Sequence, residues 1–163
     1  MNNISLKIRG LPKNTFVFLD DKLIKHKKDS FANKIYNCET EKSQISLKIY
    51  KVQDLTLKHW WLNEIVYFIF SLFGLLDFRG KGGFYELSYE AILPLDAKTE
   101  IMMSFDRKGE KAIAVSKSNI EIEEKENKKE INLIAKKRFK WLVFAKILAW
   151  ILLAVVVCVC VIN

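Results

Sequence analysis

Residues 141–162 read WLVFAKILAWILLAVVVCVCVI, and this stretch decides how the rest of the chain is organised. It carries one charged side chain, Lys146. A helix rises about 1.5 Å per residue, so a stretch of this length covers about 33 Å, enough to cross the hydrocarbon core of a bilayer. We therefore predict a C-terminal transmembrane helix over about residues 139–162. Residues 138–163 then form a basic flank and a membrane anchor.

The anchor is preceded by a cluster of basic residues, and this cluster predicts its orientation. Cytoplasmic flanks of membrane helices are enriched in Lys and Arg, so the bulk of the chain is expected on the cytoplasmic side as a single-pass, tail-anchored protein. Each such residue near the surface also attracts anionic lipid headgroups by about 1 kcal/mol. The residues expected to meet headgroups, two of them further upstream, are Arg79, Lys81, Lys136, Lys137, Arg138 and Lys140.

Charge and composition restrict the class of partner and the source. The net charge is +8. Residues 1–58 hold 12 basic and 6 acidic side chains, a net +6, and residues 79–140 hold 14 and 11, a net +3. Because these charges are interspersed and form no single basic stripe, nucleic acid is not an expected partner. Lysine outnumbers arginine 23 to 4, and Asn and Ile are frequent, which favours an AT-rich genome and a bacterial plasma membrane. Residues 1–7 alternate in polarity and have no apolar run, so no signal peptide is expected.

Most of the remaining chain alternates apolar and polar residues, the period of half-buried strands. Gly10–Asn14 and Asp20-Asp21 have turn composition, and Asp tolerates positive φ. Residues 106–110 are expected to form a hairpin loop with Gly109 at positive φ, and the charged run 124–129 is expected to be a loop. The predicted strands are 4–9, 15–19, 22–25, 34–38, 44–52, 84–95, 99–105, 111–116, 119–123 and 131–135.

Part of this pattern is similar to a known kind of module. The strand, the Gly10-Leu11-Pro12-Lys13-Asn14 turn and the strand ending in Asp20-Asp21 resemble the start of PEGA-type β-sandwich domains. Residues 43–49, SQISLKI, resemble their closing strand. The resemblance covers residues 4–52 and lacks the family's hairpin glycine and the Thr-Pro pair after it. It implies a binding or scaffolding module at a cell envelope, and it transfers no catalytic residue.

The central stretch, residues 59–78, reads HWWLNEIVYFIFSLFGLLDF and is apolar almost all round a helix. Three interpretations compete: a second transmembrane span, a helix lying in the membrane interface, or a buried core helix of the β-domain. A span places two basic parts on opposite sides of the membrane, and a core helix is too apolar for a domain of about 110 residues. We favour an amphipathic, membrane-associated helix on the cytoplasmic face, with the aromatic pair Trp60 and Trp61 as an interfacial anchor.

The few polar or small residues of this helix predict a contact surface. They fall on one narrow stripe at 100° per residue. In the simpler explanation, the side chain of Glu64 extends to water or pairs with a basic residue. In the more specific explanation, it faces a partner membrane protein. Lys146 in the anchor has the same two explanations. The residues expected at a partner or membrane interface are Trp60, Trp61, Asn63, Glu64, Tyr67, Ser71, Gly74 and Lys146.

The sequence has few residues in arrangements typical of catalysis. His26 lies in a lysine-rich loop and His59 beside Trp60, and neither has the neighbours that a metal site or a nucleophile–base pair needs. Residues 79–83, RGKGG, lack the spacing of a phosphate-binding loop and are expected to be a linker. Cys158 and Cys160 point about 200° apart on a helix and cannot easily pair. They are expected as small, membrane-buried side chains or, alternatively, as S-acylation sites. We predict no catalytic residue, no metal and no cofactor.

Together these features predict a mainly β protein with membrane helices. Residues 1–57 and 84–137 form one antiparallel β-sandwich-like domain, interrupted by the apolar helix of about residues 59–78 within an insertion at 58–83. The expected function is that of a non-catalytic accessory or scaffold subunit of a larger membrane complex, for transport or secretion. The expected partners are the bilayer, anionic headgroups, and an integral membrane protein or a second copy. The alternatives are a peripheral lipid-binding or membrane-shaping protein, and an enzyme that acts on lipid.

Overall fold

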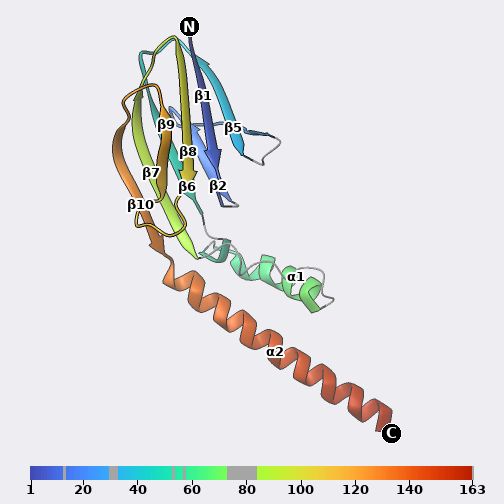
Figure 1. Cartoon of the computed structure of the whole chain (residues 1–163). Coiled ribbons are helices and arrows are strands. Elements are labelled where there is room, and N and C mark those ends of the chain that lie inside the picture. Colours follow the sequence, from blue (N-terminus) through green and yellow to red (C-terminus); the bar gives the residue numbers. More distant parts are fainter. Residues whose placement is uncertain (13, 30–32, 53, 57, 73–83, 163) are drawn as a thin grey trace. The chain divides into compact units, whose positions relative to one another are not determined.

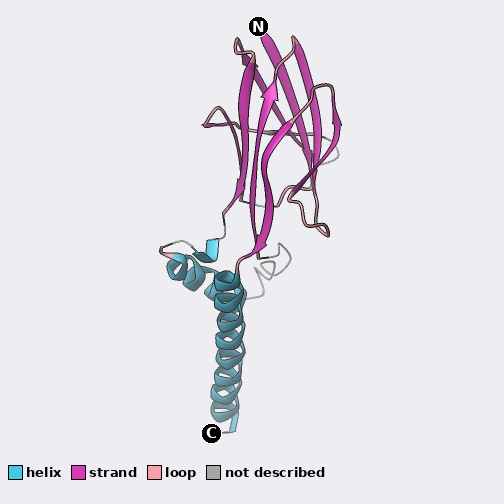
Figure 2. Cartoon of the chain, turned by 90° about the vertical axis from the view of Figure 1, so that its left-hand side faces the viewer, coloured by secondary structure: helices cyan, strands magenta, loops and turns pink. Residues whose placement is uncertain are grey.

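The structure, a computed structural model, describes residues 1–12, 14–29, 33–52, 54–56, 58–72 and 84–162. It divides into two compact units, each made of two stretches of chain. The first unit, Met1–Val52 with Tyr85–Ile131, contains two β-sheets (Figures 1 and 2). The second unit, Gln53–Phe84 with Asn132–Asn163, contains the helices. The expected mainly β architecture with a C-terminal apolar helix is therefore confirmed.

Sheet A has the strand order β4-β5-β1-β8-β9. The central strand β1 pairs antiparallel with β5 and parallel with β8, where Leu6 lies opposite Ile101. The expectation of a purely antiparallel domain is wrong at this pair, because residue alternation encodes which face is buried and not the direction of the neighbouring strand. The strands are β1 (Asn2–Arg9), β4 (Lys27–Lys28), β5 (Lys34–Thr40), β8 (Lys98–Phe105) and β9 (Ile113–Ser118).

Sheet B has the order β10-β7-β6-β2-β3 and is antiparallel throughout. The predicted two-residue turn between β2 and β3 is confirmed, since Asp20 and Asp21 have φ of 48° and 60°. Positive φ at both positions suits the twist of a tight hairpin. The strands are β2 (Thr15–Leu19), β3 (Lys22–Leu23), β6 (Gln44–Lys51), β7 (Tyr85–Pro94) and β10 (Glu123–Ile131).

The core lies among inward-facing residues of both sheets. The same five residues, Ile-Ser-Leu-Lys-Ile, occur at 4–8 in β1 and at 45–49 in β6, and in both places the aliphatic residues are buried. Each fully buried aliphatic side chain contributes about 1.5–3 kcal/mol to folding. The largest fully buried side chains of the two sheets are Leu6, Ile8, Val17, Tyr36, Leu47, Ile49, Tyr89, Leu93, Ile101, Met103 and Ile113.

The segment from residue 119 to residue 135 differs from the prediction. Residues 119–122 are not a strand, and the charged run expected to be a loop belongs to the edge strand β10. Charges and a register shift between Glu124 and Glu126 are devices that protect an edge strand from unwanted pairing, so polarity here does not indicate a loop. The strand expected at 131–135 is also wrong, because the C-terminal helix α2 (Leu133–Ile162) begins two residues after Ile131.

The loop between β8 and β9 uses its glycine for close approach. Asp106 accepts hydrogen bonds from the backbone N–H of Lys108 at 3.0 Å and of Gly109 at 2.7 Å. A Cβ on Gly109 would lie 2.0 Å from Oδ2 of Asp106. The expected positive φ at Gly109 is not found, since Gly10 is the glycine with positive φ among the described residues.

Candidate membrane and partner surfaces

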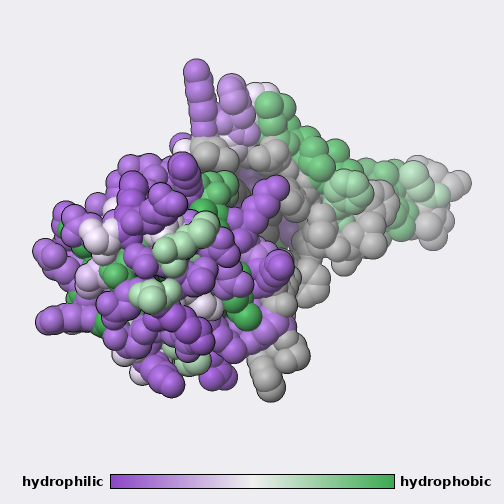
Figure 3. Space-filling view, turned by 90° about the horizontal axis from the view of Figure 1, so that it is seen from above, coloured by the Kyte–Doolittle hydropathy of each residue, from purple (hydrophilic) through white to green (hydrophobic). Residues whose placement is uncertain are grey.

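Helix α2 exposes most of its apolar length. The stretch Leu133–Cys160 is long and apolar enough to cross a membrane, and it is the one such helix in the described part of the chain. An apolar stretch of 18 residues in this helix has no residue buried in the protein. Thirty residues of helix extend about 45 Å, more than the thickness of a hydrocarbon core. In the face shown in Figure 3, hydrophobic residues dominate the described helical part and hydrophilic residues dominate the sandwich.

The start of α2 is fixed by a side-chain cap. Oδ1 of Asn132 accepts a hydrogen bond from the backbone N–H of Ala135 at 2.7 Å, the usual arrangement of an N-cap. The backbone N–H of Asn132 donates to the carbonyl of Phe84 at 2.7 Å, and the ring of Phe84 packs on that of Phe139 at 5.1 Å. An Asn directly before an apolar run is a recognised helix-start signal, which the alternation of residues 131–135 obscured.

Arg138 contacts two other helices of the same chain. Its guanidinium donates a hydrogen bond to the carbonyl of Leu55 in the short helix η1 (Asp54–Thr56). The same group lies 4.7 Å from the ring centre of Trp60, the first residue of α1 (Trp60–Leu72). A guanidinium over an indole is a favourable cation–π pair. Arg138 was expected at lipid headgroups, and the structure places it at the junction of α2, η1 and α1. Its neighbours Lys136, Lys137 and Lys140 are exposed.

Helix α1 turns its acidic residue inward and apolar residues outward. Glu64 is 7% exposed, although it was expected to face water or a partner. Six large apolar side chains of α1 are each about half exposed, and these are Trp61, Leu62, Ile65, Val66, Ile69 and Phe70. Exposed apolar patches of this kind mark membrane or protein interaction sites.

Several predicted interface residues lie wholly or partly outside the described structure. Asn63, Tyr67 and Ser71 lie in α1, but their side chains are outside the described structure, as are residues 73–83, which include Gly74, Arg79 and Lys81. Lys146 lies half-buried in α2. The polar stripe expected along α1 is thus represented by Glu64 alone.

A second surface lies at the side of the sandwich where the edge strands β9 and β10 run next to each other. The side chain of Asn127 in β10 accepts hydrogen bonds from the backbone N–H of Ala112 at 2.8 Å and of Ile113 at 3.0 Å, and donates to the carbonyl of Ile113 at 2.8 Å. Nζ of Lys129 donates to the carbonyls of Asp106, at 2.8 Å, and of Gly109. Two residues of a charged run therefore close one end of this side of the sandwich.

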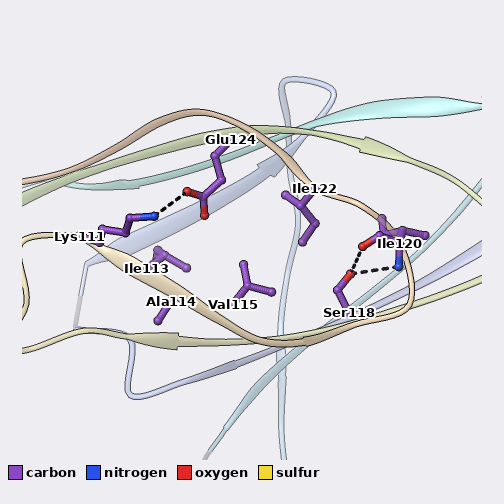
Figure 4. Close-up of a pocket in the computed structure, with 8 residues that line it drawn as sticks. All are labelled: Lys111, Ile113, Ala114, Val115, Ser118, Ile120, Ile122 and Glu124. Carbon is purple, nitrogen blue, oxygen red and sulfur yellow. Dashed lines mark hydrogen bonds and ion pairs between the residues drawn. The ribbon is translucent and has the colours of Figure 1, made fainter.

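Beyond Asn127 the two edges separate and leave a cavity of about 460 Å³ (Figure 4). Its apolar walls come from β9 and from residues 119–122, and an ion pair of 3.4 Å between Lys111 and Glu124 lies at one end. At the other end Oγ of Ser118 donates to the carbonyl of Ile120 at 2.7 Å. Sequence reasoning missed this cavity because it treated residues 124–129 as a free loop.

The described residues contain no group of three His, Cys, Asp or Glu residues placed to hold a metal ion. His26 packs against Tyr36 with ring centres 5.7 Å apart, and burial raises the pKa of Tyr36 to about 12. Cys38 is half-buried, and Cys158 and Cys160 are exposed on α2.

Comparison with protein families, with curated proteins and with solved structures finds no match to this chain. The resemblance of residues 4–52 to PEGA-type modules therefore stays a prediction.

Proposed function

We propose that this chain is a non-catalytic, membrane-anchored interaction protein. In this proposal α2 spans a bilayer, α1 lies in the interface of the same bilayer, and the β-sandwich is presented to partners at the membrane surface as part of a larger complex. The observation that carries the proposal is that both helices of one compact unit expose large apolar side chains, while Glu64 is buried and Arg138 contacts Leu55 and Trp60. A bilayer covers both apolar surfaces at once.

The position of α1 is tested by spin labelling. A label is attached at Ile69→Cys in a variant whose native cysteines are replaced by Ala, and the protein is placed in lipid nanodiscs. We expect the label to be more accessible to oxygen, which concentrates in lipid, than to a polar nickel complex. Glu41→Cys, an exposed position of the sandwich, is the matched control and should show the reverse. Preferential nickel access at Ile69 would contradict an interfacial α1.

The orientation is tested in intact cells. Lys136, Lys137 and Lys140 at the start of α2 favour a cytoplasmic sandwich. Cysteines introduced at Asn14 and Asp106, in the same cysteine-free background, are then expected to resist a membrane-impermeant thiol reagent until the cells are opened. Labelling of both in intact cells would reverse the orientation.

The same exposed lysines favour a second candidate function, selective binding of anionic lipid. After extraction in mild detergent, native mass spectrometry is expected to find anionic lipid retained on the protein. Replacing Lys136, Lys137 and Lys140 by Gln should lower this retention, and replacing Lys22, Lys117 and Lys125 of the sandwich should not. Equal retention in both triple variants would exclude headgroup binding by this cluster.

A further inference from the structure

The cavity beside β9 has the form of an unfilled strand position. Strand β9 is the last strand of sheet A and is paired on one side only, by β8, in the described part of the chain. Its other edge faces the cavity, whose far wall is the segment 119–124. Ile113 and Val115 line the near wall, and Ile120 and Ile122 line the far wall.

Where the cavity ends, the side chain of Asn127 makes hydrogen bonds to the backbone groups at this edge of β9. Its side-chain amide accepts from the N–H of Ile113 and donates to the carbonyl of Ile113, the pair of hydrogen bonds that a residue of a neighbouring strand would make. Backbone groups of successive residues point to alternate sides of a strand, so the N–H and carbonyl of Val115 point to the same side as those of Ile113. A chain that enters the cavity beyond Asn127 would therefore meet backbone hydrogen-bonding groups.

The rim of the cavity specifies the charge of such a chain. On the far wall Ile120 and Ile122 alternate with Glu121 and Glu123, which are exposed to solvent. At one end of the cavity Glu124 is paired with Lys111. An extended segment whose aliphatic side chains point into the cavity would place its outward side chains next to Glu121 and Glu123, where Lys or Arg is favoured.

We propose that the groove between β9 and residues 119–124 binds an extended segment of a partner protein, in which aliphatic residues alternate with basic ones, by adding a strand to β9. Strand addition draws affinity from main-chain hydrogen bonds and specificity from pockets for alternate side chains. This inference rests on the proposed function of the chain as an interaction protein, and it names the surface and the class of partner.

The test uses the full chain in nanodiscs of zwitterionic lipid and a fluorescent synthetic peptide with the sequence KIKLKIKV, in which aliphatic residues alternate with lysine. We expect saturable binding of one peptide per chain by fluorescence anisotropy, with empty nanodiscs as the blank. A peptide of the same composition with its aliphatic residues consecutive should bind about tenfold more weakly, because it cannot place them on one face.

Two sets of variants locate the binding. Glu121→Lys combined with Glu123→Lys is expected to weaken binding about tenfold by charge reversal, whereas the matched reversal Glu39→Lys with Glu41→Lys, on exposed carboxylates away from the groove, should leave it unchanged. Val115→Pro removes the outward N–H and keeps the pairing of β9 with β8, so it should abolish binding, whereas Val115→Thr should retain it. If Val115→Pro fails to fold, the charge-reversal pair decides.

Equal binding of both peptides, or equal losses in the two charge-reversal variants, would overturn the proposal. A dimer seen by sedimentation and broken by the Glu121/Glu123 reversal would also overturn it, because a second copy would then fill the groove. Carbonate extraction of membranes from cells that express the same variants separates the two claims. A chain that stays in the membrane without binding peptide contradicts the groove alone, and a chain that is extracted contradicts the anchored function.

Discussion

The side-chain amide of Asn127 in β10 makes to the main chain of Ile113 in β9 the two hydrogen bonds of a strand neighbour. It joins the edge of one sheet to the edge of the other, and its oxygen also accepts from the N–H of Ala112. Both Ala112 and Ile113 are fully buried. One amide group therefore satisfies three main-chain groups on this side of the sandwich.

Replacing Asn127 by Ala should destabilise the sandwich by about 2–3 kcal/mol, because buried backbone groups lose their partners. Asn127→Asp keeps the acceptor but turns a carboxylate oxygen toward the carbonyl of Ile113 and the carboxylate of Glu124, so it should cost at least as much at neutral pH. Urea unfolding of the full chain in detergent, followed by circular dichroism, measures both. Asn37→Ala, at an exposed position of β5, is the control and should change stability by less than about 0.5 kcal/mol. A loss as small for Asn127→Ala would show that water replaces the amide.

Asp106 predicts a dependence of stability on pH. Hydrogen bonds from the backbone N–H groups of Gly109 and Lys108 lower the pKa of its carboxyl below the usual 3.8. A carboxylate with a lowered folded-state pKa contributes stability that is present above pH 3.8 and is lost as pH falls through the folded-state pKa. Asp106→Asn should therefore be less stable than the wild type at pH 6 and should approach it at the lowest pH that the fold tolerates. Urea midpoints of the two proteins across this range give the comparison, and a difference independent of pH would assign the effect to shape.

The cap of α2 predicts a local effect at the junction of strand and helix. Asn132→Ala should destabilise the first turn of α2 by about 1 kcal/mol, whereas Asn132→Ser keeps a capping oxygen and should lose little. Hydrogen exchange at the amide of Ala135, which donates to Asn132, is the readout. Unchanged protection in the Ala variant would mean that packing of the buried Ala135 holds this turn.

Arg138 predicts coupling between α2 and α1. Arg138→Lys keeps the charge but loses the planar guanidinium, which lies over Trp60 and donates to the carbonyl of Leu55. This substitution should therefore not be conservative. We expect faster amide exchange across residues 60–72, corresponding to a loss of about 1–2 kcal/mol. Lys136→Met, at an exposed position two residues earlier, should leave the exchange of α1 unchanged. Equal protection of α1 in both variants would show that Arg138 does not hold it.

The alternation of residues predicts the strands where one face meets the core. In β1 and β6 the buried residues are the ones expected, since Ile4, Leu6 and Ile8 repeat every second position as do Ile45, Leu47 and Ile49. It failed at β10, where both faces are polar and pairing with β7 decides the structure. It also failed at Ile131 to Ala135. Three alternating apolar residues there resemble a strand, but the capping oxygen of Asn132 starts helix α2 instead.

The candidate surfaces were less predictable than the strands. Composition identified the C-terminal apolar helix, because length and hydropathy are properties of a continuous stretch. Arg138 acts through its contact with Leu55, and Asn127 through its contact with Ile113. These partners are distant in sequence, so the sequence alone does not reveal the pairs. A polar residue inside a basic cluster or a charged run gives no local sign that its partner is a buried carbonyl.

The parallel pairing of β1 with β8 also orders events during synthesis. Residues 3–9 occupy the centre of sheet A, yet their partners at 98–104 are made about a hundred residues later. Contacts of such large separation slow folding and leave strand edges unpaired meanwhile. One side of β1 can bind β5 early, but the other stays open until β8 has left the ribosome. The nascent chain therefore carries an exposed strand edge until residues 98–104 have been made, a stage at which chaperones or premature pairing compete for it.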